Sequence, residues 1–189
     1  MFKFAIVILL LNLYTPTFSS TKEKIISQMR YSDNLSFNFT QLIDEKKENG
    51  SCIIKYPKKI YCEYDGYDKK IIVSNGKTLV IKNRINGNYY LYPLKKTPLE
   101  LLLDKNYLIS KIKDLEPSII DNKFLAFTIF GKNNNEMKIF FNKNSLMLTG
   151  WQTEDIYQNL SMTFISSVKI NQKINDKIFI LPKKIKLSN

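Results

Sequence analysis

Two cysteines, Cys52 and Cys62, are the residues of this sequence whose type and spacing best suit covalent chemistry. Pro57 lies midway between them, so a hairpin that turns at this proline brings both side chains to one face of a sheet. In an oxidising compartment, the pair can then form a cross-strand disulfide. The alternative is two small buried apolar residues, because a disulfide needs Cα atoms about 5.5 Å apart. Both interpretations remain open from the residues alone.

Catalytic and metal-binding chemistry finds little support elsewhere in the chain. Histidine is absent from all 189 residues, which removes the usual general base, His-containing catalytic triads and His-based metal sites. The carboxylates stand in turn-like or polar contexts, and no pair is spaced for one catalytic face: Glu45, Asp65, Asp104, Asp114 and Asp121. The glycines are isolated, so a phosphate-binding loop is also missing. The sequence therefore predicts no enzyme activity, no metal site and no cofactor.

The net charge of +12 raises the question of an acidic partner. A positive field of this size attracts nucleic acid, anionic lipid or acidic polymers. The charge comes mostly from dispersed lysines, however, and Arg30 and Arg84 are the only arginines. Arginine is the residue whose planar fork suits phosphate and base recognition. We therefore expect no nucleic-acid partner, and keep a basic module that binds acidic polymers as a lesser alternative.

Residues 1–19 have the anatomy of a signal peptide: one lysine, an apolar run and then small polar residues. The apolar run is too short for a typical transmembrane anchor, so we expect export and cleavage after Ser19. Residues 20–189 are enough for one domain with its own core, and no linker divides them. We expect a single soluble domain that is monomeric.

Strand signals dominate residues 20–189. A short helix is predicted after Ser20, and from Leu35 apolar and polar residues alternate as in a half-buried strand. Asn-Gly or Asp-Gly pairs at 49–50, 65–66, 75–76 and 86–87 predict tight hairpin turns, because the central residues of such turns need positive φ. Further strands are predicted at 118–130, 136–141, 145–151, 158–168 and 177–181. The predicted fold class is mainly β (α+β), with an antiparallel sheet.

One short leucine-rich helix interrupts the strands. Thr97 as N-cap, Pro98 at the first helical position and Glu100 three residues after the cap predict a capping box. The leucines of this helix spread around most of its circumference, which predicts apolar surroundings on more than one side. They are Leu99, Leu101, Leu102 and Leu103. The many aromatic residues on strands either fill a core or line an apolar cavity in a half-closed sheet.

The order of these features resembles the periplasmic outer-membrane lipoprotein carrier family, LolA. The resemblance rests on Phe39-Thr40-Gln41 at a strand end, an apolar stretch leading into Pro57, the Ser-Asn-Gly-Lys-Thr-Leu hairpin at 74–79 and the Thr-Pro-Leu helix start at 97–99. It covers nearly all of residues 20–189. It implies an unclosed antiparallel β-barrel, with short helices forming a lid over an apolar cavity, and no covalent chemistry.

The resemblance implies a periplasmic chaperone for lipoproteins. Such a protein binds the acyl chains of lipoproteins released by an inner-membrane transporter and carries them to an outer-membrane acceptor, if one is present. For the cavity or lid we expect eight residues: Phe37, Phe39, Ile60, Val80, Leu99, Leu102, Leu103 and Trp151. The first alternative is a protein of the same fold that carries free lipid or senses envelope stress through lipoproteins.

One position departs from the family pattern. The family commonly has an arginine immediately before the proline of the first hairpin, where it contacts the lid. Here that position is Tyr56. A tyrosine hydroxyl could take over this contact by donating a hydrogen bond to a helix carbonyl.

Overall fold

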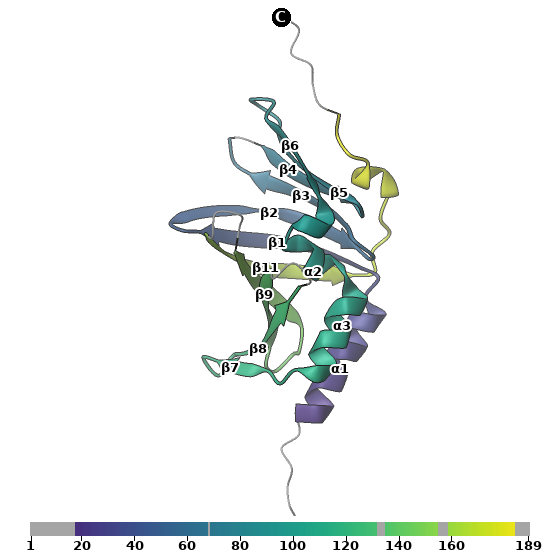
Figure 1. Cartoon of the computed structure of the whole chain (residues 1–189), viewed down its shortest axis with the longest axis vertical. Coiled ribbons are helices and arrows are strands. Elements are labelled where there is room, and N and C mark those ends of the chain that lie inside the picture. Colours follow the sequence, from purple (N-terminus) through teal and green to yellow (C-terminus); the bar gives the residue numbers. More distant parts are fainter. Residues whose placement is uncertain (1–17, 68, 132–134, 155–158, 184–189) are drawn as a thin grey trace, which may run out of the picture.

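The computed structural model describes residues 18–67, 69–131, 135–154 and 159–183 (Figure 1). The strands of the first half are β1 (Asn34–Ile43), β2 (Lys46–Lys55), β3 (Lys59–Asp65), β4 (Lys70–Asn75), β5 (Thr78–Asn83) and β6 (Tyr89–Pro93). Those of the second half are β7 (Ser118–Ile120), β8 (Phe124–Phe130), β9 (Glu136–Asn142), β10 (Leu148–Glu154) and β11 (Leu160–Ile170). They form one 11-stranded sheet in the order β6-β5-β4-β3-β2-β1-β11-β10-β9-β8-β7.

Every pair of neighbouring strands in this sheet is antiparallel. The sheet is unclosed, because β6 and β7 lie at its two ends. The α-helices of the described residues are α1 (Phe18–Tyr31), α2 (Leu99–Leu103) and α3 (Lys105–Asp114), and Figure 1 shows them on one side of the curved sheet. Two 3-10 turns, η1 (Leu94–Lys96) and η2 (Asp176–Phe179), complete the elements. The predicted mainly β class, an unclosed antiparallel sheet with short helices, is confirmed.

The hydrophobic core lies between these helices and the sheet. Ile25 of α1, Leu102 and Leu103 of α2, Ile112 of α3 and Phe127 of β8 have no exposed surface. Burying one such side chain contributes roughly 1.5–3 kcal/mol. The expectation that the leucine-rich helix is surrounded by apolar groups is therefore confirmed. None of the described helices is long and apolar enough to cross a membrane, and residues 1–17 of the expected signal peptide lie outside the described residues.

The prediction of a hairpin turn at Asn49-Gly50 is wrong. Both residues lie inside β2, and the chain turns from β1 into β2 near Asp44, whose φ is 52°. A Cβ atom at position 50 would lie 2.8 Å from the Phe39 ring and 2.2 Å from the carbonyl oxygen of Glu63. Glycine is therefore needed here because neighbouring groups approach closely, and not because the chain turns.

The predicted capping box at the start of α2 does not form, although the helix itself does. The Thr97 hydroxyl donates to the carbonyl oxygen of Leu94 at 2.8 Å, and α2 has no side-chain cap hydrogen bond at its N-terminus. The Glu100 carboxylate accepts a hydrogen bond from Lys58 Nζ instead. Lys58, which is distant in sequence, therefore binds the Glu100 side chain that the local pattern assigned to the N-terminus of the helix.

The predicted strand at 177–181 is also wrong. The segment Asp176–Phe179 forms η2, which packs on β3 and β4. The Asp176 carboxylate lies 2.6 Å from Lys55 Nζ, and the buried Phe179 ring has the Lys59 ammonium 5.7 Å from its centre. The apolar residues of this segment therefore form a short cover on the sheet, and not a further strand.

Candidate functional site

An apolar pocket of about 410 Å³ opens between the sheet and the start of α2. Its wall comes mainly from β1, β3, β4, β5, β10 and β11, and its edge comes from Lys96, Thr97, Pro98 and Leu99. The apolar residues of the wall are Phe39, Ile43, Cys52, Ile60, Cys62, Ile72, Leu79, Ile81, Tyr92, Met137 and Trp151. We call this the larger pocket. Its size falls within the range of about 300–1,000 Å³ that is usual for ligand sites.

A second apolar pocket, of about 260 Å³, lies against α1. We call this the smaller pocket, and Ile25, Leu35, Phe141 and Ile170 are among its lining residues. Helix α2 contributes to both pockets, because Leu99 lines the larger one and Leu102, three residues later, lines the smaller one. The two pockets are therefore neighbouring apolar chambers that share α2 as a boundary.

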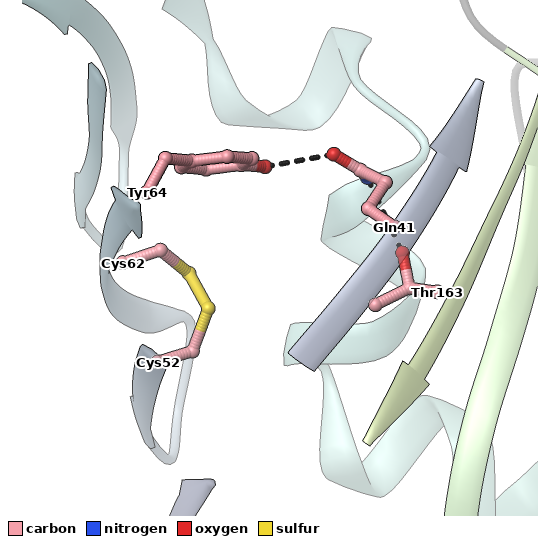
Figure 2. The surroundings of a disulfide bond; sticks show 5 residues. All are labelled: Gln41, Cys52, Cys62, Tyr64 and Thr163. Carbon is pink, nitrogen blue, oxygen red and sulfur yellow. Dashed lines mark hydrogen bonds between the residues drawn. A yellow bond between two sulfur atoms is a disulfide. The ribbon is translucent and has the colours of Figure 1, made fainter. Parts of the chain in front are cut away.

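A disulfide between Cys52 and Cys62 forms part of the wall of the larger pocket (Figure 2). The two residues lie directly opposite each other on β2 and β3, with their Cα atoms 4.1 Å apart. The bond joins positions 10 residues apart. It therefore holds the register of the hairpin whose side chains line this pocket.

Four polar side chains of the larger pocket form a hydrogen-bonded network in its mainly apolar wall. The Tyr64 hydroxyl donates to Gln41 Oε1 at 2.9 Å, and Figure 2 shows this contact together with Thr163. Gln41 Nε2 donates to Ser161 Oγ at 3.1 Å and to Thr163 Oγ1 at 3.2 Å. Burial raises the pKa of the Tyr64 hydroxyl, and the nearby charge of Glu48 adds to this rise. The hydroxyl therefore keeps its proton at neutral pH and acts as a donor.

Charged groups stand beside this network at the pocket rim. Lys70 Nζ lies 2.6 Å from Glu48 Oε2 and 3.8 Å from the centre of the Tyr64 ring, and Lys46 Nζ lies 3.0 Å from Glu48 Oε1. Partial burial tends to raise the pKa of Glu48, but the hydrogen bonds and charges of the two lysines outweigh it and lower the pKa overall. Glu48 is therefore ionised at neutral pH, and it partly neutralises the lysines around it.

Lys58, at the tip of the β2–β3 hairpin, fastens α2. Its amide donates to the carbonyl oxygen of Leu103 at 3.0 Å, and its Nζ lies 3.0 Å from Glu100 Oε1 and 3.1 Å from Asp104 Oδ2. The hydrogen bond to Glu100 is the main cause of a raised Lys58 pKa, and a weaker effect of burial opposes it. Because these side chains are about a third exposed, each ion pair contributes at most about 1 kcal/mol.

Helices α1 and α3 are fastened to each other through more deeply buried lysines. Lys22 Nζ pairs with Glu116 at 2.6 Å and donates to the carbonyl oxygen of Leu115, just beyond α3. Lys105 Nζ donates to the carbonyl oxygen of Ser32, just beyond α1. Each lysine thus lies at the C-terminal end of the other helix, where the helix dipole favours a cation. The side chains of Lys22 and Lys105 are only 15% and 16% exposed, against 32% for Lys58. Solvent therefore screens the ion pairs that hold α2 more than those that join α1 and α3.

The structure places the expected cavity and lid residues in several environments. Those that line the larger pocket are Phe39, Ile60, Leu99 and Trp151. Leu102 lines the smaller pocket, whereas Phe37 and Leu103 are packed in the core and line neither pocket. Most of these residues therefore lie around the two chambers or directly behind them.

Val80 is the exception among these residues. It is fully buried, but its neighbours Leu79 and Ile81 both line the larger pocket. Because side chains alternate between the two faces of a strand, Val80 points to the opposite face of the sheet. It pairs there with Val73 and Leu91, so we leave it out of the site.

Tyr56 lies against α3 and lines the smaller pocket. The Lys105 ammonium lies 5.2 Å from the centre of its ring, and burial raises the pKa of its hydroxyl. In the described part of the chain, the Tyr56 hydroxyl donates no hydrogen bond to a helix carbonyl, which is the contact that a tyrosine at this position could have made. The hairpin residue that holds α2 is Lys58, two positions later.

Sequence reasoning did not single out Lys58 or the polar network. The Phe-x-Gln pattern marked Gln41 as part of a motif but assigned it no role. On β11 the pattern is inverted, since Ser161 and Thr163 are buried while Leu160 and Phe164 are 46% and 38% exposed. Alternation alone would assign the apolar residues to the inner face. No signal in the sequence reveals this inversion.

The site has the chemistry of a binding cavity. In the described residues, no cluster of His, Cys, Asp or Glu could hold a metal ion, and the two cysteines are joined to each other. Apolar side chains make most of both linings, and four of the polar side chains of the larger pocket are hydrogen-bonded to one another in the wall. This arrangement suits a long apolar ligand that carries a small number of polar atoms.

Comparison with known proteins finds one matching family and several solved structures with a similar fold. The family described as outer membrane lipoprotein carrier protein LolA matches residues 30–182. Among solved structures, an uncharacterized conserved protein from Thermus thermophilus has a TM-score of 0.50 at 7% identity, over 87% of this chain and 94% of that one. A LolA superfamily protein from Nitrosomonas europaea has a TM-score of 0.47 at 10% identity, over 88% and 99% of the two chains.

A structure of the MucA/MucB complex from Pseudomonas aeruginosa is also similar. Its TM-score is 0.44 at 8% identity, over 91% of this chain and 64% of that one. No curated protein matches the sequence. At such low identities, the likeness to solved structures concerns the fold alone.

Proposed function

This chain belongs to the family of the outer membrane lipoprotein carrier protein LolA, and from that membership we propose that it carries lipoproteins across the periplasm. Proteins of this family are periplasmic carriers and are not enzymes. In our proposal, residues 1–19 direct export and are removed, and residues 20–189 act as one monomeric domain. This domain receives lipoprotein acyl chains from an inner-membrane transporter and delivers them to an outer-membrane acceptor.

The observation that carries this proposal is the pair of apolar pockets on either side of α2. Leu99 and Leu102 of this one helix line different pockets, so a displacement of α2 would join them into one longer apolar space. We propose that α2 is the movable lid and that Lys58 is its latch. The disulfide in the wall supports the location, because such bonds persist in oxidising compartments such as the periplasm.

The free energy gained by an acyl chain on leaving water exceeds the free energy needed to displace the lid. An acyl chain of about sixteen carbons gains roughly 12 kcal/mol on leaving water, at about 0.8 kcal/mol per methylene. Exposing Leu101, Leu102 and Leu103, the three buried leucines of α2, costs about 4.5–9 kcal/mol. The ligand therefore outcompetes the lid. The lid still subtracts from the net affinity, which helps the carrier to release its cargo.

The proposal is tested by a release assay. Inner-membrane vesicles that contain the releasing transporter and a tri-acylated lipoprotein are incubated with ATP and the purified protein. We expect the lipoprotein to leave the vesicles and to co-purify with the protein in the soluble fraction, because the pockets shield its chains from water. If the protein takes up free phospholipid but releases no lipoprotein, the free-lipid carrier is correct and the lipoprotein role is not.

Replacing the latch should strengthen ligand binding. Lys58→Met removes both ion pairs to α2 but keeps the amide bond to Leu103, because that bond uses the backbone. If the closed lid loses about 1 kcal/mol, the affinity for a fluorescent apolar dye should rise about fivefold, while the urea midpoint changes little. Lys59→Met is the matched control, since the neighbouring Lys59 pairs with Asp176 and not with α2. Equal dye affinity in the two variants would remove the latch from the proposal.

A further inference from the structure

The polar network of the larger pocket contains two hydroxyl groups, those of Ser161 and Thr163, whose hydrogens are not used within the network. Gln41 Nε2 donates its two hydrogens to Ser161 Oγ and Thr163 Oγ1, so both hydroxyl oxygens act as acceptors in the network. Each hydroxyl also carries one hydrogen of its own that it can donate. Within the described residues, neither hydroxyl donates this hydrogen to a protein acceptor. Both side chains line the pocket and are 7% and 3% exposed.

We propose that Ser161 and Thr163 form a carbonyl-recognition site, which binds the ester or amide oxygens that join acyl chains to the rest of a lipidated molecule. This inference rests on the proposed carrier function and goes further, because it names the atoms of the cargo that the protein recognises. The apolar wall would hold the hydrocarbon, and the two hydroxyls would fix the point where the hydrocarbon ends.

The geometry of the strands prepares this site. Gln41 and Thr163 are directly paired on β1 and β11, and Ser161 lies two residues before Thr163 on the same face of β11. Tyr64 reaches from β3 to hold Gln41 Oε1, so the amide is oriented before any ligand arrives. Preorganised donors in a buried site bind an acceptor without the cost of ordering them.

The charged side chains at the rim favour a ligand with neutral carbonyl groups over one with a free carboxylate or phosphate. Lys70, whose Nζ lies 3.8 Å from the centre of the Tyr64 ring of the network, already pairs with Glu48 at 2.6 Å. A free carboxylate or phosphate would have to compete with Glu48 for this lysine. Neutral ester and amide carbonyls face no such competitor, and buried donors left unpaired penalise a ligand that lacks acceptors. The site therefore suits acylated molecules better than free fatty acids or plain hydrocarbon.

The test compares two peptides that differ only at the chain junction. One carries a palmitoyl chain through an amide, and the other carries a hexadecyl chain through an ether link. Trp151 is the only tryptophan of the chain and lines the larger pocket, so its emission reports binding of each peptide. In the double variant Ser161→Ala with Thr163→Val, the affinity for the amide-linked peptide should fall about fivefold for each lost hydrogen bond. The affinity for the ether-linked peptide should not fall, because its junction has no carbonyl oxygen for the two hydroxyls to bind.

Thr40→Val is the matched control for this experiment. Thr40 precedes Gln41, and its hydroxyl donates to Asn49 Oδ1 at 2.8 Å outside both pockets, so this variant should keep the preference for the amide-linked peptide. An equal loss of affinity for both peptides in the double variant would show that the network only braces the sheet, and would overturn the carbonyl site. So would an unchanged preference in the double variant. If neither peptide binds the unmodified protein, the carrier function itself fails together with this inference.

Discussion

Replacing Leu99 with glutamate is expected to lower the affinity for acyl ligands at least about a hundredfold, which corresponds to about 2.8 kcal/mol. Leu99 lines the larger pocket from the lid, and an acyl chain bound there would cover the new carboxylate. Burying an unpaired charge costs several kcal/mol. Leu99 is only half-buried in the ligand-free protein, so the glutamate can remain in water until a ligand arrives. The sheet should therefore stay folded.

Binding of the amide-linked palmitoyl peptide, followed through Trp151 emission, measures this effect. Leu91→Glu is the matched control, because Leu91 is 57% exposed on β6 and lies outside both pockets. Circular dichroism and the urea midpoint should be similar in the two variants. Normal peptide binding by the Leu99→Glu variant, with a folded sheet, would remove α2 from the binding site.

Loss of the disulfide is expected to give the largest change in stability among our predictions. Closing a loop between Cys52 and Cys62, which are 10 residues apart, contributes about 3 kcal/mol in the chain-entropy estimate. The Cys52→Ala, Cys62→Ala double variant should therefore unfold at a clearly lower urea concentration. Ligand affinity should also fall, because the hairpin that these residues join forms part of the pocket wall.

Reduction of the unmodified protein distinguishes the effect of the covalent bond on stability from the effect of losing the two sulfur atoms. The reduced protein keeps every side-chain atom, so its urea midpoint should fall nearly as far as that of the double variant. The exported protein should show no free thiols by mass measurement before reduction. Two free thiols in that protein, or an unchanged midpoint after reduction, would contradict the role given to this bond.

Features that depend on neighbouring residues could be predicted well from the sequence. The chain turns directly after Asn75, where Gly76 adopts a φ of 99° and Asn75 Oδ1 accepts hydrogen bonds from the amides of Lys77 and Thr78. Asn75 itself ends β4, so of the predicted pair only the glycine has a positive φ. The same locality explains the pairing of Cys52 with Cys62, since a short hairpin at Pro57 leaves few other registers. The resemblance to the LolA family also correctly indicated the unclosed sheet.

Features that depend on distant strands could not be predicted in this way. Asn49-Gly50 is a residue pair typical of hairpin turns, yet it lies in the middle of β2. The Phe39 ring leaves no room there for a residue larger than glycine. The candidate site shows the same limit, because β11 pairs with β1 between residues that are 118 to 135 positions apart, from Ile43 with Ser161 to Leu35 with Ile170. That pairing alone turns Ser161 and Thr163 towards the pocket.

The sequence by itself determined most of the strands, the leucine-rich helix and the resemblance to the family, because each is encoded by a local pattern or by the order of such patterns. It allowed a bond between Cys52 and Cys62 without deciding it. Only the tertiary structure decided which face each strand buries, that α2 divides two pockets, and that Lys58 fastens it. A shift of one residue in strand register exchanges the two faces of a strand. The register is set by contacts between residues far apart in the chain, so the lining of the cavity is a property of the folded protein.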